Sequence, residues 1–271
     1  MQSFTNIHAL IIDMDGVLWE GTKALPGLQD FFELLRQQKL PFILATNNAS
    51  LTQDQYIKKL KLMGVNVSAN EILTSSMATA HYLSEQVDPK DNSVLVIGED
   101  GLRQPLTDKG FTLIDTPFDK LGKVADFVIC GLDRQLTWDK LAEASLHISA
   151  GAKFIASNAD TTLPTERGPV LGNGAILAAL EAATQVAPTI IGKPEPIMYQ
   201  QAITKLGAPL DNTIAIGDRL NTDILGAVNT GIRSIMVLTG ISTKQDLNSI
   251  NYQPTWIMPD IRSITKALQS M

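Results

Sequence analysis

The stretch Ala9-Leu10-Ile11-Ile12-Asp13-Met14-Asp15-Gly16 decides the fold. Its four apolar residues predict a buried strand, and the acidic residues that follow place negative charge at the carboxyl end of that strand. Ligands of open parallel sheets bind at this end of the strands. Two carboxylates two residues apart, followed by a glycine that permits a sharp turn, form an oxygen-rich pocket suited to Mg²⁺. Taken alone, the spacing is equally well explained by a solvated turn.

The same pattern returns in the last third of the chain. Residues 213–216 predict a strand that continues into Gly217-Asp218, and Asp223 lies in the first turn of the helix expected next. Asp218, at the strand tip, is therefore a second candidate metal ligand. For Asp223 a carboxylate that stabilises a helix N-terminus is the simpler alternative.

Two further segments supply hydroxyl, amide and positively charged groups. Thr46-Asn47-Asn48 follows a predicted strand at 41–45, and Lys193 lies within Gly192-Lys193-Pro194. Hydroxyl and backbone N–H groups can hold phosphoryl oxygens, and a lysine can neutralise their charge. An ordinary turn and a solvated lysine are the alternatives for each segment alone. One parallel sheet would align all four segments at one edge, and this coincidence favours a single site.

The rest of the chain alternates short apolar runs with longer segments of helical period. This alternation predicts an α/β fold with a doubly wound parallel sheet covered by helices, a Rossmann-like core. The first block has predicted strands at 9–12, 41–45 and 72–73 and helices at 26–38 and 52–63. The last block has predicted strands at 213–216 and 234–238 and helices at 221–228 and 261–268.

A domain-sized segment separates these two blocks. It contains predicted strands at 94–97, 127–130 and 153–156 and predicted helices at 138–149 and 175–183. A chain of 271 residues is long enough for two domains. We therefore expect residues 1–77 and 190–271 to form a discontinuous core, and residues 78–189 to form a smaller inserted α/β domain.

Composition excludes several classes of protein. The chain is 44% hydrophobic and 18% charged, as expected of a folded protein, and its net charge of −6 disfavours binding to nucleic acid or anionic membranes. No apolar run is long enough to span a membrane, because Glu181 interrupts the best candidate at 175–183. The single Cys130 cannot form an internal disulfide, and the first residues lack the pattern of a secretory signal, so we expect a cytoplasmic protein. No function is assigned to the three histidines, His8, His81 and His147.

In their order along the chain, these motifs resemble those of the haloacid dehalogenase superfamily. The resemblance covers the whole chain, from Asp13-Met14-Asp15-Gly16-Val17-Leu18 and Ala45-Thr46-Asn47-Asn48, across the insert, to Gly192-Lys193-Pro194 and Gly217-Asp218 with Asp223. Gly21 with Pro26-Gly27, and an insert between the second and third motifs, are similar to the NagD or 4-nitrophenylphosphatase group. The resemblance thus implies that residues 78–189 are a C2-type cap domain.

The resemblance implies a Mg²⁺-dependent phosphatase that hydrolyses a small phosphomonoester through an aspartyl-phosphate. Asp13 would be the nucleophile, and Asp15 would protonate the leaving oxygen and then activate water, as covalent and general acid–base catalysis require. Asp15 also argues against the dehalogenase branch, which lacks this second carboxylate. The implied Mg²⁺ ligands are Asp13, the backbone carbonyl of Asp15, and Asp218. Lys193 and Thr46 would neutralise or bind the phosphoryl oxygens, and Asp223 would orient a metal-bound water or Lys193.

Residues of the inserted domain are expected to contact the substrate. Asn158-Ala159-Asp160 and residues 164–174 fall where the cap of this family approaches the active site, although ordinary loop chemistry explains them equally well. Trp19 and Glu20 could line the entrance, with packing an equally good explanation for the tryptophan. The predicted substrate-binding residues are Gly16, Asn47, Asn48, Asn158 and Asp160.

Two other functions are compatible with these motifs. A phosphomutase would return the phosphoryl group to a second oxygen, and a noncatalytic phosphorylation switch would also combine a doubly wound sheet with acids, a threonine and a lysine. A switch of the receiver type is about half this length and needs no second carboxylate at Asp15. The expected partner is a small phosphorylated metabolite, with nucleotides, sugar phosphates, phosphoglycolate and pyridoxal phosphate all open. The resemblance also suggests a homodimer.

Overall fold

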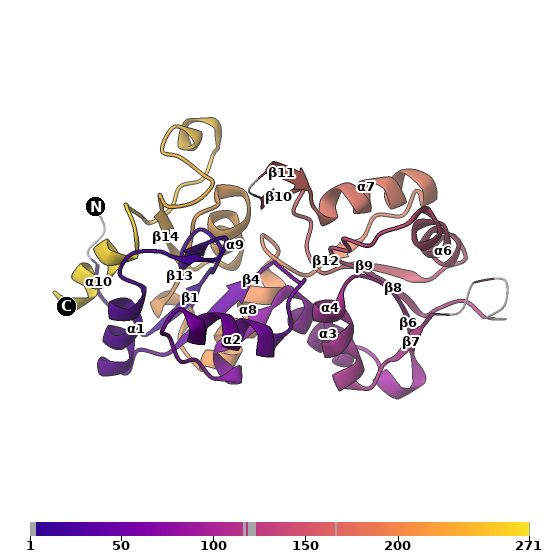
Figure 1. Ribbon diagram of the computed structural model, residues 1–271, viewed down its shortest axis with the longest axis horizontal. Helices are drawn as coiled ribbons and strands as arrows, with labels where there is room; N and C mark the ends of the chain where they lie inside the picture. Colours follow the sequence, from indigo (N-terminus) through magenta and orange to yellow (C-terminus); the bar gives the residue numbers. More distant parts are fainter. Residues whose placement is uncertain (1–3, 116–117, 119–122, 166, 271) are drawn as a thin grey trace. The chain divides into compact units, whose positions relative to one another are not determined.

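The computed structural model describes residues 4–115, 118, 123–165 and 167–270. It has the predicted α/β fold, with parallel sheets flanked by helices (Figure 1). The chain divides into two compact units. The core unit takes in residues 1–46, 54–73 and 193–271, and the insert unit takes in residues 47–53 and 74–192. The assignment of residues 1–77 and 190–271 to a catalytic core, and of 78–189 to a cap, stays a prediction.

The sheet of the core unit is built around β1 (Ala9–Ile12), whose four residues are all buried. β1 pairs in parallel with β13 (Thr213–Gly217) on one side and with β4 (Phe42–Thr46) on the other. The strand order is β15 (Trp256–Met258), β14 (Arg233–Val237), β13, β1, β4 and β5 (Ile72–Thr74). Because Ile12 is in register with Ile216 and Leu44, the segments that follow these three strands emerge side by side.

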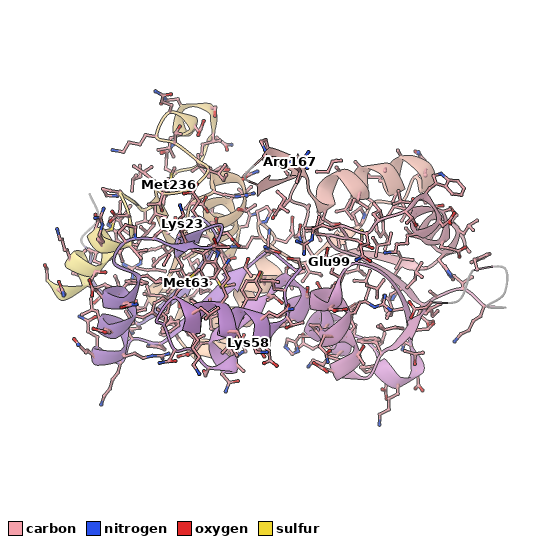
Figure 2. All side chains as sticks on the ribbon, in the orientation of Figure 1. Lys23, Lys58, Met63, Glu99, Arg167 and Met236 are labelled. Atoms are coloured by element: carbon pink, nitrogen blue, oxygen red, sulfur yellow. The ribbon has the colours of Figure 1, made fainter. Side chains whose placement is uncertain are left out.

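Helices cover this sheet through apolar faces. They are α1 (Leu28–Gln37), α2 (Gln53–Leu62), α8 (Pro196–Leu206), α9 (Leu225–Thr230) and α10 (Ile261–Gln269). α1 packs against α10, and α8 packs against α9 and β4. In Figure 2, charged side chains such as that of Lys58 project outward, whereas Met236 of β14 lies in the buried interior. Burial of these apolar faces drives the folding of the unit.

The insert unit has a parallel sheet of its own. Its strand order is β12 (Thr189–Ile190), β9 (Lys153–Ala156), β8 (Phe127–Cys130), β6 (Ser93–Ile97) and β7 (Thr112–Ile114). Its helices include α3 (Ser75–Ser84), α4 (Asp100–Lys109), α6 (Trp138–Ser149) and α7 (Asn173–Thr184). α6 and α7 pack together over a core that contains Val128, Ile148 and Leu180.

Two short antiparallel hairpins lie outside the parallel sheets. β2 (Trp19–Glu20) pairs with β3 (Lys23–Ala24), and β10 (Thr162–Thr165) pairs with β11 (Gly168–Leu171). The helix predicted at 221–228 begins as a π-helical turn, η4 (Leu220–Ile224), and continues as α9. Single π-helical turns are rare and are frequently found at functional sites. Among the described residues, every helix is too short or too polar to cross a lipid bilayer.

Candidate active site

Three neighbouring strands of the core unit deliver polar residues to one edge of the sheet. Asp13 directly follows β1, Thr46 ends β4, and Asp218 directly follows β13. The Asp13 backbone N–H donates to the Ile216 carbonyl over 2.8 Å, so the parallel pairing continues up to the first acid. The sheet therefore places the acids from the two ends of the chain in one cluster, as expected from the carboxyl edge of a parallel sheet.

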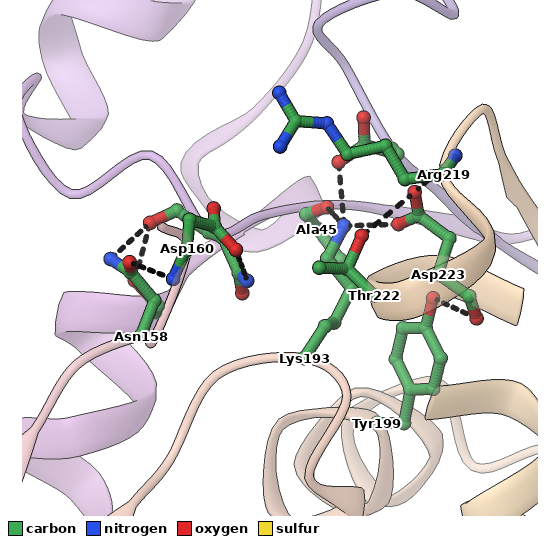
Figure 3. A network of polar contacts seen from close by, with 11 residues as sticks. Ala45, Asn158, Asp160, Lys193, Tyr199, Arg219, Thr222 and Asp223 are labelled. Carbon is green, nitrogen blue, oxygen red and sulfur yellow. Dashed lines mark hydrogen bonds and ion pairs between the residues drawn. The ribbon is translucent and has the colours of Figure 1, made fainter. Parts of the chain in front are cut away.

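The Lys193 side chain lies at the centre of this cluster (Figure 3). Its Nζ donates over 2.6 Å to Asp13 Oδ1, over 2.6 Å to Asp223 Oδ1 and over 3.0 Å to the Ala45 carbonyl. Lys193 is only 2% exposed, so a solvated lysine does not explain this residue. A buried ammonium with three acceptors is held in one position.

Burial changes the pKa values of these groups. Burial raises the pKa of Asp13 well above its ordinary value, and the neighbouring carboxylates add to this against the opposing effect of Lys193. Burial lowers the pKa of the Lys193 ammonium, but Asp13 and Asp223 outweigh this effect, so its pKa rises well above the ordinary value. Burial, followed by the charge of Asp223, raises the pKa of Asp218 to about 6. Lys193 thus stays charged, and three carboxyl groups, those of Asp13, Asp218 and Asp223, lie around this one buried ammonium.

The surplus of carboxylates fits a divalent cation. Asp13, Asp218 and Asp223 each offer an oxygen, and these oxygens lie within 4.8 Å of one another. Asp218 Oδ2 accepts the Ile241 backbone N–H over 2.7 Å. Asp218 Oδ1 is buried and has no hydrogen-bond partner among the described residues. A buried carboxylate oxygen without a partner is costly, so this atom and the cluster of three carboxyl groups both suit a hard cation such as Mg²⁺.

Asp223 comes from the π-helical turn η4 and uses both of its oxygens. Oδ1 accepts from Lys193, and Oδ2 accepts the Arg219 backbone N–H over 3.1 Å. The Tyr199 hydroxyl donates to the Asp223 carbonyl over 3.3 Å. Asp223 is therefore fixed from both sides and lies where it can hold Lys193 in place.

The Asp15 side chain is oriented differently from the other acids. It is partly exposed, and its Oδ1 accepts a hydrogen bond of 2.8 Å from the indole N–H of Trp19. Trp19 itself is fully buried, so it does not line an entrance. The side chain thus points toward Trp19, and the backbone carbonyl of Asp15 remains the predicted Mg²⁺ ligand.

Glycines shape the space around Asp218. Gly16 has a φ of +82°, and a Cβ there would lie 2.7 Å from Asp218 Oδ2. A Cβ at Gly240 would lie 1.9 Å from the same oxygen. Both positions therefore require glycine for Asp218 to keep its place. The contacts from Gly240 and Ile241 are functional features that the sequence reasoning missed, because a backbone contact carries no motif.

Three of the predicted substrate-binding residues come together within the insert unit. Asn47 Nδ2 donates to Asp160 Oδ1 over 3.0 Å, and Asn158 Nδ2 donates to the Asn47 carbonyl over 2.9 Å (Figure 3). Asn173 Nδ2 donates to the Asn158 carbonyl over 2.6 Å. These amides therefore connect the segment after β4 with the segment after β9. Asn48 differs, because its Oδ1 accepts from the Ser50 backbone N–H and hydroxyl in a local turn.

Comparisons with known proteins show the family of the chain. Residues 10–112 match the haloacid dehalogenase-like hydrolase family, and residues 190–264 match the HAD-hydrolase-like family. The chain is 36% identical to an acid sugar phosphatase of Staphylococcus saprophyticus, over 97% of this chain and 99% of that protein.

Solved structures give the same result. A 4-nitrophenylphosphatase of Thermotoga maritima superposes with a TM-score of 0.90 at 33% identity, covering 97% of this chain and 98% of that one. NagD of E. coli K-12 superposes with a TM-score of 0.84 at 35% identity, covering 94% and 97%. The chain therefore belongs to the haloacid dehalogenase superfamily, in its group of NagD-like and 4-nitrophenylphosphatase-like phosphatases.

Proposed function

We propose that the chain is a Mg²⁺-dependent phosphatase that hydrolyses small phosphomonoesters through a phosphoryl group carried by Asp13. The observation that supports this most is the contact of Lys193 with Asp13 and Asp223, together with Asp218 Oδ1, to which no described residue donates a hydrogen bond. In a purely structural ion pair one cation would face one carboxylate. Here three carboxyl groups surround one ammonium, and a bound cation would complete the set.

In the first step, an Asp13 carboxylate oxygen attacks phosphorus while the bond from phosphorus to the leaving oxygen breaks. Asp15 gives its proton to that oxygen, so the alcohol leaves neutral. In the second step Asp15 takes a proton from water, the water oxygen attacks phosphorus, and the bond between phosphorus and Asp13 breaks. Inorganic phosphate leaves, and both aspartates return to their starting states.

Positive charge must accompany the phosphoryl group, because an anionic nucleophile is repelled by a phosphate dianion. Lys193 supplies one charge at Asp13 itself, where its ammonium donates to Oδ1. Asp13, the Asp15 carbonyl and Asp218 would hold Mg²⁺, which supplies charge that Lys193 alone cannot. Asp223 keeps Lys193 in position, and the Thr46 hydroxyl would donate a hydrogen bond to a phosphoryl oxygen.

The substrate is proposed to be a small phosphate ester, with sugar phosphates the first class to examine. This follows from relatives named acid sugar phosphatase and 4-nitrophenylphosphatase. The insert unit, with Asn158 and Asp160, is proposed to act as the cap that selects the leaving group. A cytoplasmic location and a homodimer are also proposed, from composition and resemblance.

Steady-state hydrolysis of 4-nitrophenyl phosphate tests the proposal. With Mg²⁺ we expect many turnovers for each chain, reversible loss of activity on chelation, and a background rate for Asp13→Asn. Asp30→Asn on the exposed surface of α1 is the matched control and should keep full activity. One round of phosphorylation without turnover would favour the switch instead. Release of phosphate that carries no oxygen from labelled water would favour a mutase.

A further inference from the structure

The hydrogen bond from Trp19 to Asp15 is not explained by packing of the tryptophan. The indole N–H donates to Asp15 Oδ1 over 2.8 Å, from the first residue of β2 to a residue four positions earlier in the loop after β1. This loop closes on itself, because the Gly16 backbone N–H donates to the Trp19 carbonyl over 2.8 Å. The backbone thus brings the indole alongside the Asp15 carboxylate.

The indole ring is itself held by two residues of the core unit. The Tyr56 ring stacks on it at 6.4 Å between centroids, and the Lys59 ammonium lies 4.1 Å from the ring centroid. Tyr56 and Lys59 are three residues apart and so share one face of α2. Tyr56 and Trp19 are almost completely buried. A ring fixed in this way offers its N–H in one direction only.

We propose that Trp19 is a positioning residue for the general acid and base, fixing the Asp15 carboxylate so that Oδ2 is the oxygen that exchanges protons. This inference rests on the proposed function. A carboxylate has two equivalent oxygens and rotates freely unless a hydrogen bond holds one of them. The hydrogen bond from the indole N–H to Oδ1 restricts this rotation. Oδ2 is then the oxygen that protonates the leaving oxygen and later takes a proton from water.

The test compares leaving groups in Trp19→Phe, which removes the N–H and keeps an aromatic ring. The departing oxygen of phenyl phosphate needs a proton from Asp15, whereas that of 2,4-dinitrophenyl phosphate leaves well without one. We expect kcat/KM for phenyl phosphate to fall roughly ten- to hundredfold, the equivalent of one hydrogen bond to a charged group. The value of kcat/KM for 2,4-dinitrophenyl phosphate, which reports the transfer step alone, should change less than about threefold.

The ratio of the two rates is measured on one preparation, so a partly unfolded sample does not alter it. Trp138→Phe, at an exposed tryptophan of α6, is the matched control and should leave the ratio unchanged. Equal losses for both substrates in Trp19→Phe would overturn the inference and show a purely structural role.

Asp15→Asn separates this failure from failure of the proposed function. If Asp15 is the general acid, Asp15→Asn must lose far more kcat/KM on phenyl phosphate than on 2,4-dinitrophenyl phosphate, because kcat/KM reports the transfer to Asp13 and not the later hydrolysis. Should Asp15→Asn show no such preference, the proposed acid role itself is wrong. If Asp15→Asn shows it and Trp19→Phe does not, only the positioning role is wrong.

Discussion

At the scale of single residues, Lys193 is the residue on which the cluster most depends. Lys193→Met would leave the Asp13 and Asp223 carboxylates buried without their shared cation. Removing one partner of a buried ion pair costs about 3 to 5 kcal/mol, so we expect a loss of that size in the free energy of unfolding. Urea denaturation with a chelator present measures it.

The double variant Lys193→Met with Asp223→Asn is the control for this experiment. It removes one of the two buried carboxylates that have lost their cation, so its free energy of unfolding should be higher than that of Lys193→Met alone. Equal stability of Lys193→Met and the wild type would mean that the ion pairs contribute nothing to folding.

The sequence predicted the members of this cluster but not all of their contacts. Asp13, Lys193, Asp218 and Asp223 could be found because each follows a strand or lies in a motif. The hydrogen bond from Ile241 to Asp218, and that from Trp19 to Asp15, could not be found. The first involves a backbone group of a distant loop. The second depends on how the loop after β1 turns, and tryptophans are usually explained by packing.

At the scale of elements, the loop after β14 positions Asp218. A Cβ at Gly240 would lie 1.9 Å from Asp218 Oδ2, so Gly240→Ala must displace either the loop or the carboxylate. We expect the affinity for Mg²⁺ to fall at least about tenfold, which is the effect of about 1.4 kcal/mol. Isothermal titration calorimetry with Mg²⁺ measures this affinity.

Gly207→Ala is the control for the effect of an added methyl group. Gly207 ends α8, and its Cβ would meet open space, although its φ of +61° makes alanine locally strained. Its affinity for Mg²⁺ should equal that of the wild type. An unchanged affinity in Gly240→Ala would show that the loop after β14 does not constrain the metal site.

Most of the long elements of the fold could be predicted, whereas most of the short ones could not, the strand at 72–73 being an exception. The apolar runs at β1, β4, β6, β8, β9, β13 and β14 gave strands where they were expected. Strands of two or three residues, such as β12 and β7, are too short to show a period. α4 contains Pro105, which argues against a helix in the sequence. α3 has buried residues on several sides and therefore no clear polar face.

At the scale of the whole molecule, His147 links stability to pH. His147 is buried in the insert unit, its Nδ1 accepts the Ala125 backbone N–H over 2.9 Å, and burial lowers its pKa. As the pH falls below about 6.5, the unfolded chain binds a proton at this residue before the folded chain does. The free energy of unfolding contributed by His147 should therefore decrease on acidification.

Urea denaturation at pH 7.5 and pH 5.5 measures this effect. We expect the decrease between these two values to be smaller in His147→Asn, which does not titrate there, than in the wild type. The same decrease in both proteins would show that His147 is protonated equally well in the folded state.

The sequence predicts an insert from its length and from its own strands and helices, and it leaves residues 47–53 in the core. In the structure, residues 47–53 group with residues 74–192 in one compact unit. This segment follows β4 directly, so its position in the sequence suggests the core. Its contacts with Asn158 and Asp160, more than one hundred residues away, decide its grouping, and such contacts leave no local pattern.

The account depends most on Asp13 as the nucleophile, whose carboxylate oxygen receives the phosphoryl group. Asp15→Asn mixed with 2,4-dinitrophenyl phosphate and Mg²⁺ should transfer the group quickly, because this leaving group needs no proton, and then hydrolyse it slowly. We predict a burst of dinitrophenol close to one equivalent for each chain, with the phosphoryl group mapped by mass spectrometry of the acid-quenched protein to Asp13. A burst with the phosphoryl group on any other residue, or steady turnover with Asp13 unmodified, would contradict the account.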